Sequence, residues 1–400
     1  MLDTLPNGWR ICRVDDIKAK TDSAIAIGPF GSRMKSDCYV DRGIPVIRGN
    51  NISDTKSFTG EFVCVSPDTA ASLNSSNVYD GDLVFPHRGL IGEVGIVTGG
   101  TKAHYMLSTS LMKLTANREA ADPLFLFYYF RSPLGRHELL KNASQVGTPG
   151  IATPLASLRA ISVTLPPLPE QRAIAGVLGA LDDKIELNRR MNETLEAIAK
   201  AEFRRMMEEG GPGTLGEIAE NPKRAVDPSE IDASTPYIGL EHMPRRCIAL
   251  GEWGTAGDLE SGKARFQRGE ILFGKLRPYF HKVGVAPLDG VCSTDILTIA
   301  PKKPAWFGLV LGHLSSKELI DHTDACSTGT KMPRASWADI ARYEIALPPE
   351  PVAAKLTGVV QPLVERIIAN IHESRTLAAL RDALLPKLLS GQIRIQGVKA

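Results

Sequence analysis

Two long stretches of the chain repeat apolar residues at steps that alternate between four and three positions. The first follows the run Leu165–Arg172, and the second follows Leu347–Pro351. This spacing is typical of an amphipathic helix that packs on another helix as a coiled coil. The prolines predict an extended entry and then a first helical turn. The repeating positions are Ile174, Leu178, Leu181, Ile185, Asn188, Asn192, Leu195 and Ala199 in the first stretch, and Leu356, Val360, Leu363, Ile367, Asn370, Ser374, Leu377 and Arg381 in the second.

Both predicted helices carry an asparagine at the same place. The offset is constant, because 347 − 165 = 182 and 370 − 188 = 182. A helix of this length spans roughly 55 Å, at about 1.5 Å per residue. An asparagine within a coiled coil costs stability but fixes the register. If the helices pack antiparallel with their centres aligned, Asn188 should meet Asn370. The alternative is that each asparagine lies at a solvated helix edge. Separately, the charged run that begins at Asp182 is expected to form a solvated face of the first helix.

The segments before and between the helices are mixed and resemble each other in order. Ile44–Ile52 and Gly81–Gly89 each predict a strand that leads into a polar loop, Gly92–Val97 a hairpin partner, and Pro123–His137 a helix. The second segment contains matching stretches in the same order. They are Thr235–Leu240, Gly269–Arg277, Val283–Val285 and Cys292–Ile296, and the last of these matches Leu107–Leu111 of the first segment. Such a repeat with variable loops indicates two equivalent binding modules. Duplication retained for stability alone is the other interpretation.

The predicted class is therefore α+β, with two mixed α/β domains separated by two long antiparallel helices that form a coiled coil. The predicted bounds are 1–168 for the first domain, 169–210 for the first helix, 211–348 for the second domain, 349–394 for the second helix and 395–400 for a tail.

Composition narrows the functional classes. The hydrophobic fraction of 43% is that of an ordinary globular protein, and the net charge of +2 places any nucleic-acid contact in local basic patches. We see no apolar run of 18 residues and no secretion leader, so we expect a cytoplasmic protein without a membrane span. The six scattered cysteines form no C-x-x-C pair, which argues against a zinc site or a disulfide scaffold.

Motifs for catalysis are missing. Gly257–Ala264 has the glycine and lysine spacing of a phosphate-binding loop but lacks its final Ser or Thr, and we interpret it as a chance match. The chain contains no G-x-S-x-G and no H-E-x-x-H, and its eight histidines are dispersed. These observations favour binding over catalysis, and we predict no catalytic residue and no metal site.

At this point the repeat resembles a known family. The Leu165–Arg172 run with Ile174–Ile185, Asn188 and Leu195 is similar to a conserved region of type I restriction-modification specificity subunits, and Leu384–Arg394 is similar to their second conserved region. The Gly-Asp-Leu-Val and Gly-Glu-Ile-Leu strands resemble those of their target recognition domains. The resemblance covers nearly the whole chain.

The resemblance implies that each mixed segment reads one half of a bipartite double-stranded DNA site. It also implies that the helices act as a spacer and dock two methyltransferase subunits, which restriction or translocase subunits can join. S-adenosylmethionine, ATP and magnesium would then belong to the partners and not to this chain. One departure concerns the polar cluster of Glu170 and Gln171, since the 182 offset places Val352 and Ala353 there in the second helix. If that cluster docks a partner, the two docking contacts differ.

Basic side chains in the predicted loops are the candidate DNA contacts, because Arg and Lys pair with guanine edges or with phosphates. For any single member, an ordinary solvated surface charge is the competing interpretation. The candidates are Arg33, Lys35, Arg48, His87 and Arg88 in the first segment, and Arg245, Lys275, Arg277, Tyr279, Lys331 and Arg334 in the second. The residues expected to set helix register or dock partners are Glu170, Gln171, Asn188 and Asn370.

Two rival functions remain at this point. A single-chain restriction or methylation enzyme would need a methyl-donor loop or a paired-carboxylate metal site, and we find neither in the sequence. A coiled-coil adaptor that binds only protein would show no affinity for any duplex.

Overall fold

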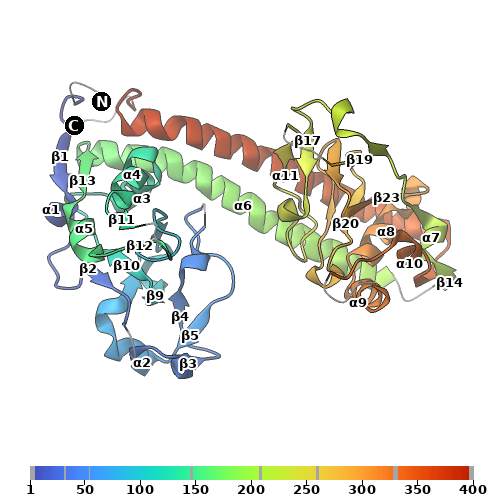
Figure 1. Cartoon of the computed structure of the whole chain (residues 1–400), viewed down its shortest axis with the longest axis horizontal. Coiled ribbons are helices and arrows are strands. Elements are labelled where there is room, and N and C mark those ends of the chain that lie inside the picture. Colours follow the sequence, from blue (N-terminus) through green and yellow to red (C-terminus); the bar gives the residue numbers. More distant parts are fainter. Residues whose placement is uncertain are drawn as a thin grey trace. The chain divides into compact units, whose positions relative to one another are not determined.

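The computed structural model describes residues 5–30, 33–53, 55–144, 147–206, 210–257, 261–327 and 332–395. The chain divides into two compact units, whose elements Figure 1 labels. Unit 1 is Met1–Lys184 together with Leu377–Ala400, and unit 2 is Ile185–Thr376. The two long helices are α6 (Leu168–Met206) and α11 (Glu350–Leu389), so each unit contains a part of both.

Unit 1 contains two main sheets. Its strands are β1 (Arg10–Arg13), β2 (Ile25–Ile27), β3 (Tyr39–Val40), β4 (Ile44–Ile47), β5 (Val63–Val65), β6 (Asn77–Tyr79), β7 (Leu83–Pro86), β8 (Gly95–Ile96), β9 (His104–Leu107), β10 (Leu111–Leu114), β11 (Ala143–Ser144), β12 (Gly150–Ile151) and β13 (Ser162–Leu165). The sheet orders are β2-β10-β7-β8 and β3-β5-β4-β9-β6, with β1 paired to β13 and β11 to β12. Strands β4 and β9 are parallel, whereas the other pairs are antiparallel.

Unit 2 repeats this topology. Its strands are β14 (Gly211–Thr214), β15 (Ala219–Glu220), β16 (Ala225–Val226), β17 (Pro236–Ile238), β18 (Gly254–Thr255), β19 (Lys263–Phe266), β20 (Ile271–Gly274), β21 (Val283–Val285), β22 (Gly290–Ser293), β23 (Ile296–Pro301) and β24 (Glu344–Leu347). The order β15-β23-β20-β21 matches the four-stranded sheet of unit 1 strand for strand. In the order β16-β19-β22-β17-β18, the pair β17 and β22 is parallel, as β4 and β9 are. The predicted repeat of strands is therefore confirmed.

Shorter helices flank the sheets at equivalent places. They are α1 (Val14–Ile17), α2 (Pro67–Ser72), α3 (Pro123–Arg131), α4 (Pro133–Leu140) and α5 (Pro154–Ala160) in unit 1, and α7 (Leu215–Ile218), α8 (Phe307–Leu314), α9 (Lys317–Cys326) and α10 (Trp337–Ala341) in unit 2. The single helix expected over Pro123–His137 is wrong. The segment breaks at Ser132, whose hydroxyl caps α4 by accepting from the Gly135 amide at 3.2 Å, and Pro133 favours a new helix start there.

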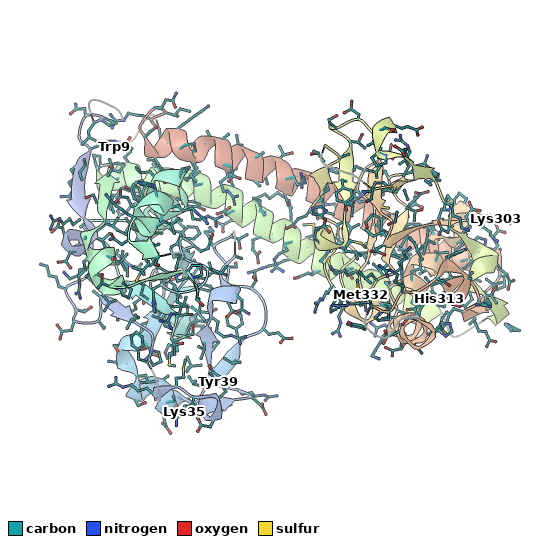
Figure 2. All side chains as sticks on the ribbon, viewed as in Figure 1. Trp9, Lys35, Tyr39, Lys303, His313 and Met332 are labelled. Carbon is teal, nitrogen blue, oxygen red and sulfur yellow. The ribbon has the colours of Figure 1, made fainter. Side chains whose placement is uncertain are left out.

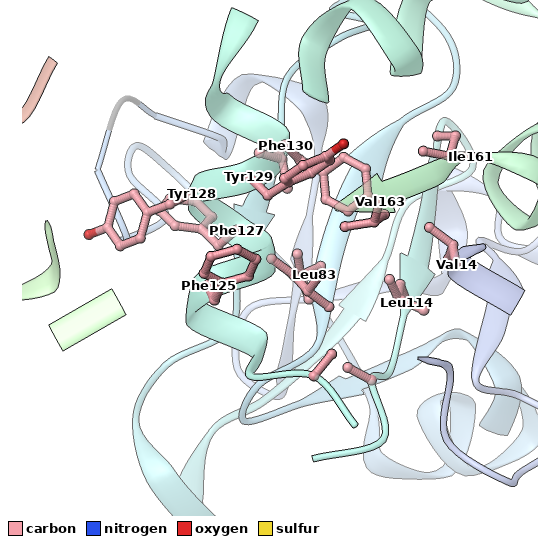
Figure 3. Packing of buried hydrophobic residues seen from close by; sticks show 14 of the residues in the cluster. Val14, Leu83, Leu114, Phe125, Phe127, Tyr128, Tyr129, Phe130, Ile161 and Val163 are labelled. Atoms are coloured by element: carbon pink, nitrogen blue, oxygen red, sulfur yellow. The ribbon is translucent and has the colours of Figure 1, made fainter. Parts of the chain in front are cut away.

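The core of unit 1 is dominated by aromatic side chains of α3. Phe125, Phe127 and Phe130 are fully buried, and the Phe130 ring meets the Phe85 ring edge-on with centroids 5.0 Å apart. Figure 3 shows these rings with Leu83 and the strand residues around them. Burial of this much aromatic surface is a large stabilising contribution.

The polar turn before β7 and β20 has the same design in both units. Gly81 and Gly269 adopt φ +88° and +87°, and each is followed by a buried carboxylate. Asp82 accepts hydrogen bonds from the Tyr79 amide and the Thr115 hydroxyl, with Lys113 4.0 Å away. Glu270 accepts from the Gln267 amide and twice from Arg224, at 2.8 and 2.9 Å.

In unit 2 the parts of α6 and α11 run antiparallel and meet through amide side chains. The Asn188 amide donates to Glu373 at 2.8 Å, to Ser374 at 3.2 Å and to the Asn370 carbonyl at 3.5 Å. Asn370 donates to Asn192 Oδ1 at 2.8 Å. Asn188 and Asn370 are 0% and 1% exposed. The predicted meeting of the two asparagines is confirmed, and the solvated-edge alternative is excluded.

In unit 1 the parts of α6 and α11 meet through a buried ion pair. Arg381 Nη1 lies 2.7 Å from Asp182 Oδ1, and the Tyr128 hydroxyl donates to Asp182 Oδ2 at 2.6 Å. The expectation that Asp182 lies on a solvated face is wrong, because its side chain is 1% exposed. The aspartate occupies the inner face of α6, where its charge is balanced by an arginine of α11 and a tyrosine of α3.

Within the part of the chain that the structure describes, no helix combines the length and the apolar composition needed to cross a membrane.

Candidate nucleic-acid interface

Unit 1 brings three loops together at the ends of its strands. We call residues 87–90, 108–110 and 147–150 loop cluster 1. The His87 amide donates to Ser110 at 2.9 Å, the Ile151 amide donates back to His87 at 2.9 Å, and the Gly89 amide donates to Pro149 at 2.8 Å. Arg88 bridges to Gly150, and its side chain is exposed. The backbone is therefore tied on both sides of an arginine that faces solvent.

Unit 2 builds the same arrangement, which we call loop cluster 2 (residues 275–277, 293–295 and 332–335). The Lys275 amide donates to Asp295 at 2.9 Å, the Ala335 amide donates to Lys275 at 2.9 Å, and the Arg277 amide donates to Pro333 at 2.8 Å. Leu276 bridges to Arg334. Because each hydrogen bond has its counterpart in loop cluster 1, the two clusters can be aligned residue by residue.

That alignment corrects one sequence-based match. The sequence suggests that Arg277 takes the place of Arg88. The backbone contacts instead align Lys275 with His87, Leu276 with Arg88, and Arg277 with Gly89. The match of Arg277 with Arg88 is wrong by one position. The equal spacing of Gly81–Gly89 and Gly269–Arg277 already places Arg277 on Gly89, and the hydrogen bonds confirm this register.

The backbone at this position is left-handed in both clusters. Gly89 has φ +83°, which costs glycine little, whereas Arg277 has φ +52° and ψ +67°. A residue with a Cβ loses about 1–2 kcal/mol in that region. Arg246 and His281 are left-handed as well, and the Arg246 amide donates to the His281 carbonyl at 2.8 Å. Such strain concentrates at functional sites, so it points to loop cluster 2.

The remaining candidates of unit 2 lie around loop cluster 2. Arg334 is held by Asp295, with Nε and Oδ1 3.1 Å apart. The guanidinium of Arg245 stacks 4.0 Å above the Phe280 ring in η8 (Pro278–Phe280), and Tyr279 is 47% exposed. Lys331 lies outside the described residues. Unit 2 therefore gathers Arg245, Lys275, Arg277, Tyr279 and Arg334 in one region of its surface.

In unit 1 the candidates are less concentrated. The Arg33 amide donates to Phe30, whose ring centroid lies 6.3 Å from that of His87, so Arg33 adjoins loop cluster 1. Arg48 follows β4 and donates to the Glu61 carbonyl at 3.0 Å. Lys35 lies beside Tyr39 of β3, away from β12, as Figures 1 and 2 show. Lys35 is therefore not part of loop cluster 1.

His87 differs from the other candidates because it is buried. Its side chain is 6% exposed, and Nε2 lies 3.1 Å from the Thr109 carbonyl. Burial lowers the pKa of His87, and the carbonyl contact only partly offsets this. The imidazole is thus neutral near pH 7 and supports the loop, and a direct contact with DNA would require it to leave this position.

A cavity of about 580 Å³ lies beside loop cluster 2 and reaches the C-terminal part of α6. Its charged lining residues are Lys200, Arg204, Arg246, Lys317, Glu318, Asp321 and Asp324. Four cations face three acids, and Lys200 and Lys317 are already paired, with Glu196 and Asp321. The lining therefore favours neither sign of charge.

Comparisons with known proteins fit this arrangement. The family model described as the type I restriction modification DNA specificity domain matches residues 30–197. The chain is similar to this family over those residues. The resemblance inferred from the sequence is therefore confirmed.

Two curated proteins to which this chain is similar come from Methanocaldococcus jannaschii. The type I restriction enzyme MjaIX specificity subunit is 26% identical over 306 residues, which cover 68% of this chain and 69% of that one. The putative type I restriction enzyme MjaX specificity subunit is 22% identical over 422 residues and covers 98% and 95%. The crystal structure of the type-I restriction-modification system S subunit from M. genitalium is 15% identical, covers 96% and 97%, and has a TM-score of 0.60. It shares the fold, with two mixed α/β domains and a helical spacer.

Two polar side chains in the first turn of α6, Glu170 and Gln171, lie inside unit 1. Glu170 is 5% exposed and accepts two hydrogen bonds from Arg394, at 2.9 and 2.7 Å, and one from Trp9 at 3.2 Å. Gln171 is 1% exposed, accepts from the Asp122 amide at 2.9 Å and donates to Pro166 at 2.8 Å. A contact of either side chain with a partner subunit would first have to break these hydrogen bonds.

Two further residues in or beside the loop clusters did not stand out in the sequence. Phe30 is 58% exposed next to His87, and nothing in its local pattern separates it from an ordinary loop residue. Asp295 orients Arg334 and takes the place of Ser110. The match between Leu107–Leu111 and Cys292–Ile296 could have indicated this replacement. Among the described residues there is no group of three His, Cys, Asp or Glu that could hold a metal ion.

Proposed function

We propose that this chain is the DNA sequence-recognition subunit of a type I restriction-modification complex, in which each unit reads one half of a bipartite site. The main support is the pair of matched loop clusters on equivalent scaffolds, each with basic side chains at rigid strand ends. Arginine and lysine recognise guanine edges in the major groove, and other basic side chains position the protein on phosphates.

In this proposal the paired helices α6 and α11 set the separation of the two half-sites. Two modules fixed to one spacer can read sequences about one turn of DNA apart, or roughly 34–36 Å. Linking two weak readers raises the overall affinity through effective concentration when the spacer geometry fits. Asn188 and Asn370 would keep this register, because each must meet a polar partner on the other helix.

The same helices would dock two methyltransferase subunits, with restriction or translocase subunits added to the assembly. Exposed apolar side chains on the helices support this, among them Leu187 and Ile198 of α6 and Val359 and Leu380 of α11. Glu170 and Gln171 would act indirectly, by holding the start of α6 within unit 1. S-adenosylmethionine, ATP and magnesium would be bound by the partners, and this chain would bind DNA without catalysing a reaction.

The direct test is a gel-shift titration of the full chain, co-expressed with its methyltransferase partner, at fixed salt. Arg277→Ala should weaken duplex binding while the fold stays intact, because the guanidinium of loop cluster 2 is lost. Arg342→Ala is the matched control, since Arg342 is exposed on unit 2 and pairs with Asp339 away from the cluster. Unchanged affinity of Arg277→Ala would remove it from the interface.

A second measurement distinguishes the rival functions. Mapping methylated adenines in the genome of the source cell should give a two-part motif with a fixed gap. An adaptor that binds only protein would show no affinity for any duplex, even with its partners. A single-chain enzyme would methylate DNA as an isolated chain.

A further inference from the structure

Arg277 occupies the most unusual backbone position of loop cluster 2. Its φ and ψ of +52° and +67° lie in the left-handed region, and the next residue is Pro278. A proline disfavours the helical region in the residue before it and favours an extended conformation. The backbone of Arg277 is neither extended nor in a region with negative φ, where residues with a Cβ ordinarily lie. A glycine would satisfy this backbone with far less strain, as Gly89 does at the aligned position of unit 1.

The strained backbone is also held firmly. The Arg277 amide donates to Pro333 at 2.8 Å, and its carbonyl accepts from the Phe280 amide at 2.9 Å. The flanking Lys275 is fixed by hydrogen bonds to Asp295 and Ala335. The direction in which the Arg277 side chain leaves the protein is therefore set by the loop and does not depend on the side chain itself.

The guanidinium is not used to hold the fold. Among the residues that the structure describes, no hydrogen bond or ion pair of the Arg277 side chain is present, and the residue is half-buried. Arg334 differs in this respect, because Asp295 holds its guanidinium, and Arg245 stacks on Phe280. Arg277 is thus a cation of loop cluster 2 with a fixed base and an uncommitted head group.

We propose that Arg277 is a specificity-determining residue that reads a guanine edge in the half-site bound by unit 2. This inference rests on the proposed function and adds which residue contacts a base. A phosphate contact tolerates a flexible cation, whereas bidentate recognition of guanine O6 and N7 requires a planar donor in a fixed orientation. A rigid loop that carries an arginine where a glycine would be less strained therefore suits bidentate recognition of guanine.

The test uses the full chain co-expressed with its methyltransferase partner and a random duplex library, with bound sequences read out by sequencing. The variants are Arg277→Gly, Arg277→Lys and Lys223→Gly. Lys223 is the matched control, because it is an exposed, left-handed basic residue of unit 2 that lies outside loop cluster 2 and whose replacement relieves the same kind of backbone strain. Thermal melting of each variant reports on the fold.

For Arg277→Gly we expect an unchanged or higher Tm and loss of guanine preference at one position of one half-site, by roughly 5- to 150-fold. The preference at the other half-site should be unchanged. Arg277→Lys should retain the guanine at reduced preference, because lysine lacks the planar pair of donors. Lys223→Gly should raise or maintain Tm and leave the preference at every position unchanged.

Three results would overturn the inference. The first is an Arg277→Gly protein with the wild-type preference at every position. The second is uniform weakening across all sequences with a salt slope reduced by about one, which is the behaviour of a phosphate contact. The third is a wild-type protein that selects no sequence, and only this result would overturn the proposed function as well.

Discussion

The two units join their parts of α6 and α11 with different polar chemistry. Unit 1 uses a buried ion pair, Asp182 with Arg381, which the Tyr128 hydroxyl completes. Unit 2 uses uncharged amides, in which Asn188 and Asn370 each bond across to the other helix. We call the first set of contacts the charged layer and the second the amide layer. Both oppose a shift in register between the two helices, since a shift would leave buried polar groups without partners. The comparison shows that two equivalent helix contacts can both depend on buried polar partners, although one uses charged side chains and the other uses amides.

The largest effect should come from breaking the charged layer in unit 1. Arg381→Met leaves the Asp182 carboxylate buried without its cation, which should lower the free energy of unfolding by about 3–5 kcal/mol. The triple variant Tyr128→Phe, Asp182→Leu and Arg381→Met removes the whole network and should recover most of that loss. Chemical denaturation measures both proteins. If the triple variant is as unstable as the single one, the explanation by an unpaired charge is incorrect.

The next largest effect is a loss of folding stability at low pH, which comes from a buried histidine of unit 2. Burial lowers the pKa of His313 to about 4, and among the residues that the structure describes its Nε2 has no hydrogen-bond partner. In the unfolded chain His313 binds a proton near pH 6.5, whereas in the folded chain it stays neutral down to about pH 4. The free energy of unfolding is therefore unaffected by this group above pH 6.5 and falls as the pH drops toward 4. The loss should reach up to about 3 kcal/mol.

His313→Phe tests this dependence, because a phenylalanine can retain the edge contact with the Phe203 ring, whose centroid lies 5.0 Å away. Denaturation curves between pH 7 and pH 4 should fall less steeply for the variant. In unit 1, Tyr129 is buried but its hydroxyl donates to the Ser162 carbonyl, so Tyr129→Phe should leave the slope over this pH range unchanged. Parallel curves for His313→Phe and the parent protein would rule out His313 as the source.

The smallest effect on folding should come from the amide layer. Asn188→Leu removes the donor to Glu373, Ser374 and the Asn370 carbonyl, which should cost about 1–2 kcal/mol. Its effect on assembly should be larger, because the leucine tolerates shifted registers that the asparagine opposes. Thermal melting and pull-down of the methyltransferase partner measure the two effects. Arg190→Leu adds a leucine at an exposed site of α6 and serves as the control, and normal results in both assays for Asn188→Leu would contradict the register role.

The long helices and the repeated strands could be predicted because their signals are local. The alternating steps of four and three placed Leu178 and Leu356 on buried faces, and the constant offset identified Asn188 and Asn370. The Gly81 and Gly269 turns marked matching strands. Adjacency in the sheets could not be predicted in this way, since β4 pairs in parallel with β9, which follows much later in the chain.

Buried charges were the other limit. Asp182 is flanked by Asp183 and Lys184, and this pattern is typical of a solvated helix face. Only the positions of Arg381 and Tyr128, which come from distant segments, explain its burial. The candidate DNA contacts could be predicted only as a set of basic loop residues, and they stay a prediction. The equivalence of Arg277 with Gly89 is contained in the equal spacing from Gly269 and Gly81, and the hydrogen bonds of both loop clusters confirm it.

The division of the chain has a consequence for its synthesis. Unit 2 is one continuous segment, whereas the core of unit 1 combines Trp9, Ile174 and Leu178 with Leu385 and Leu388 of α11. A ribosome that adds about 5–20 residues per second needs on the order of tens of seconds to travel from Leu178 to Leu388. During that interval the apolar surface of unit 1 that awaits α11 stays uncovered. The unit made first is therefore the last to be completed, and it is the one most exposed to aggregation on the ribosome.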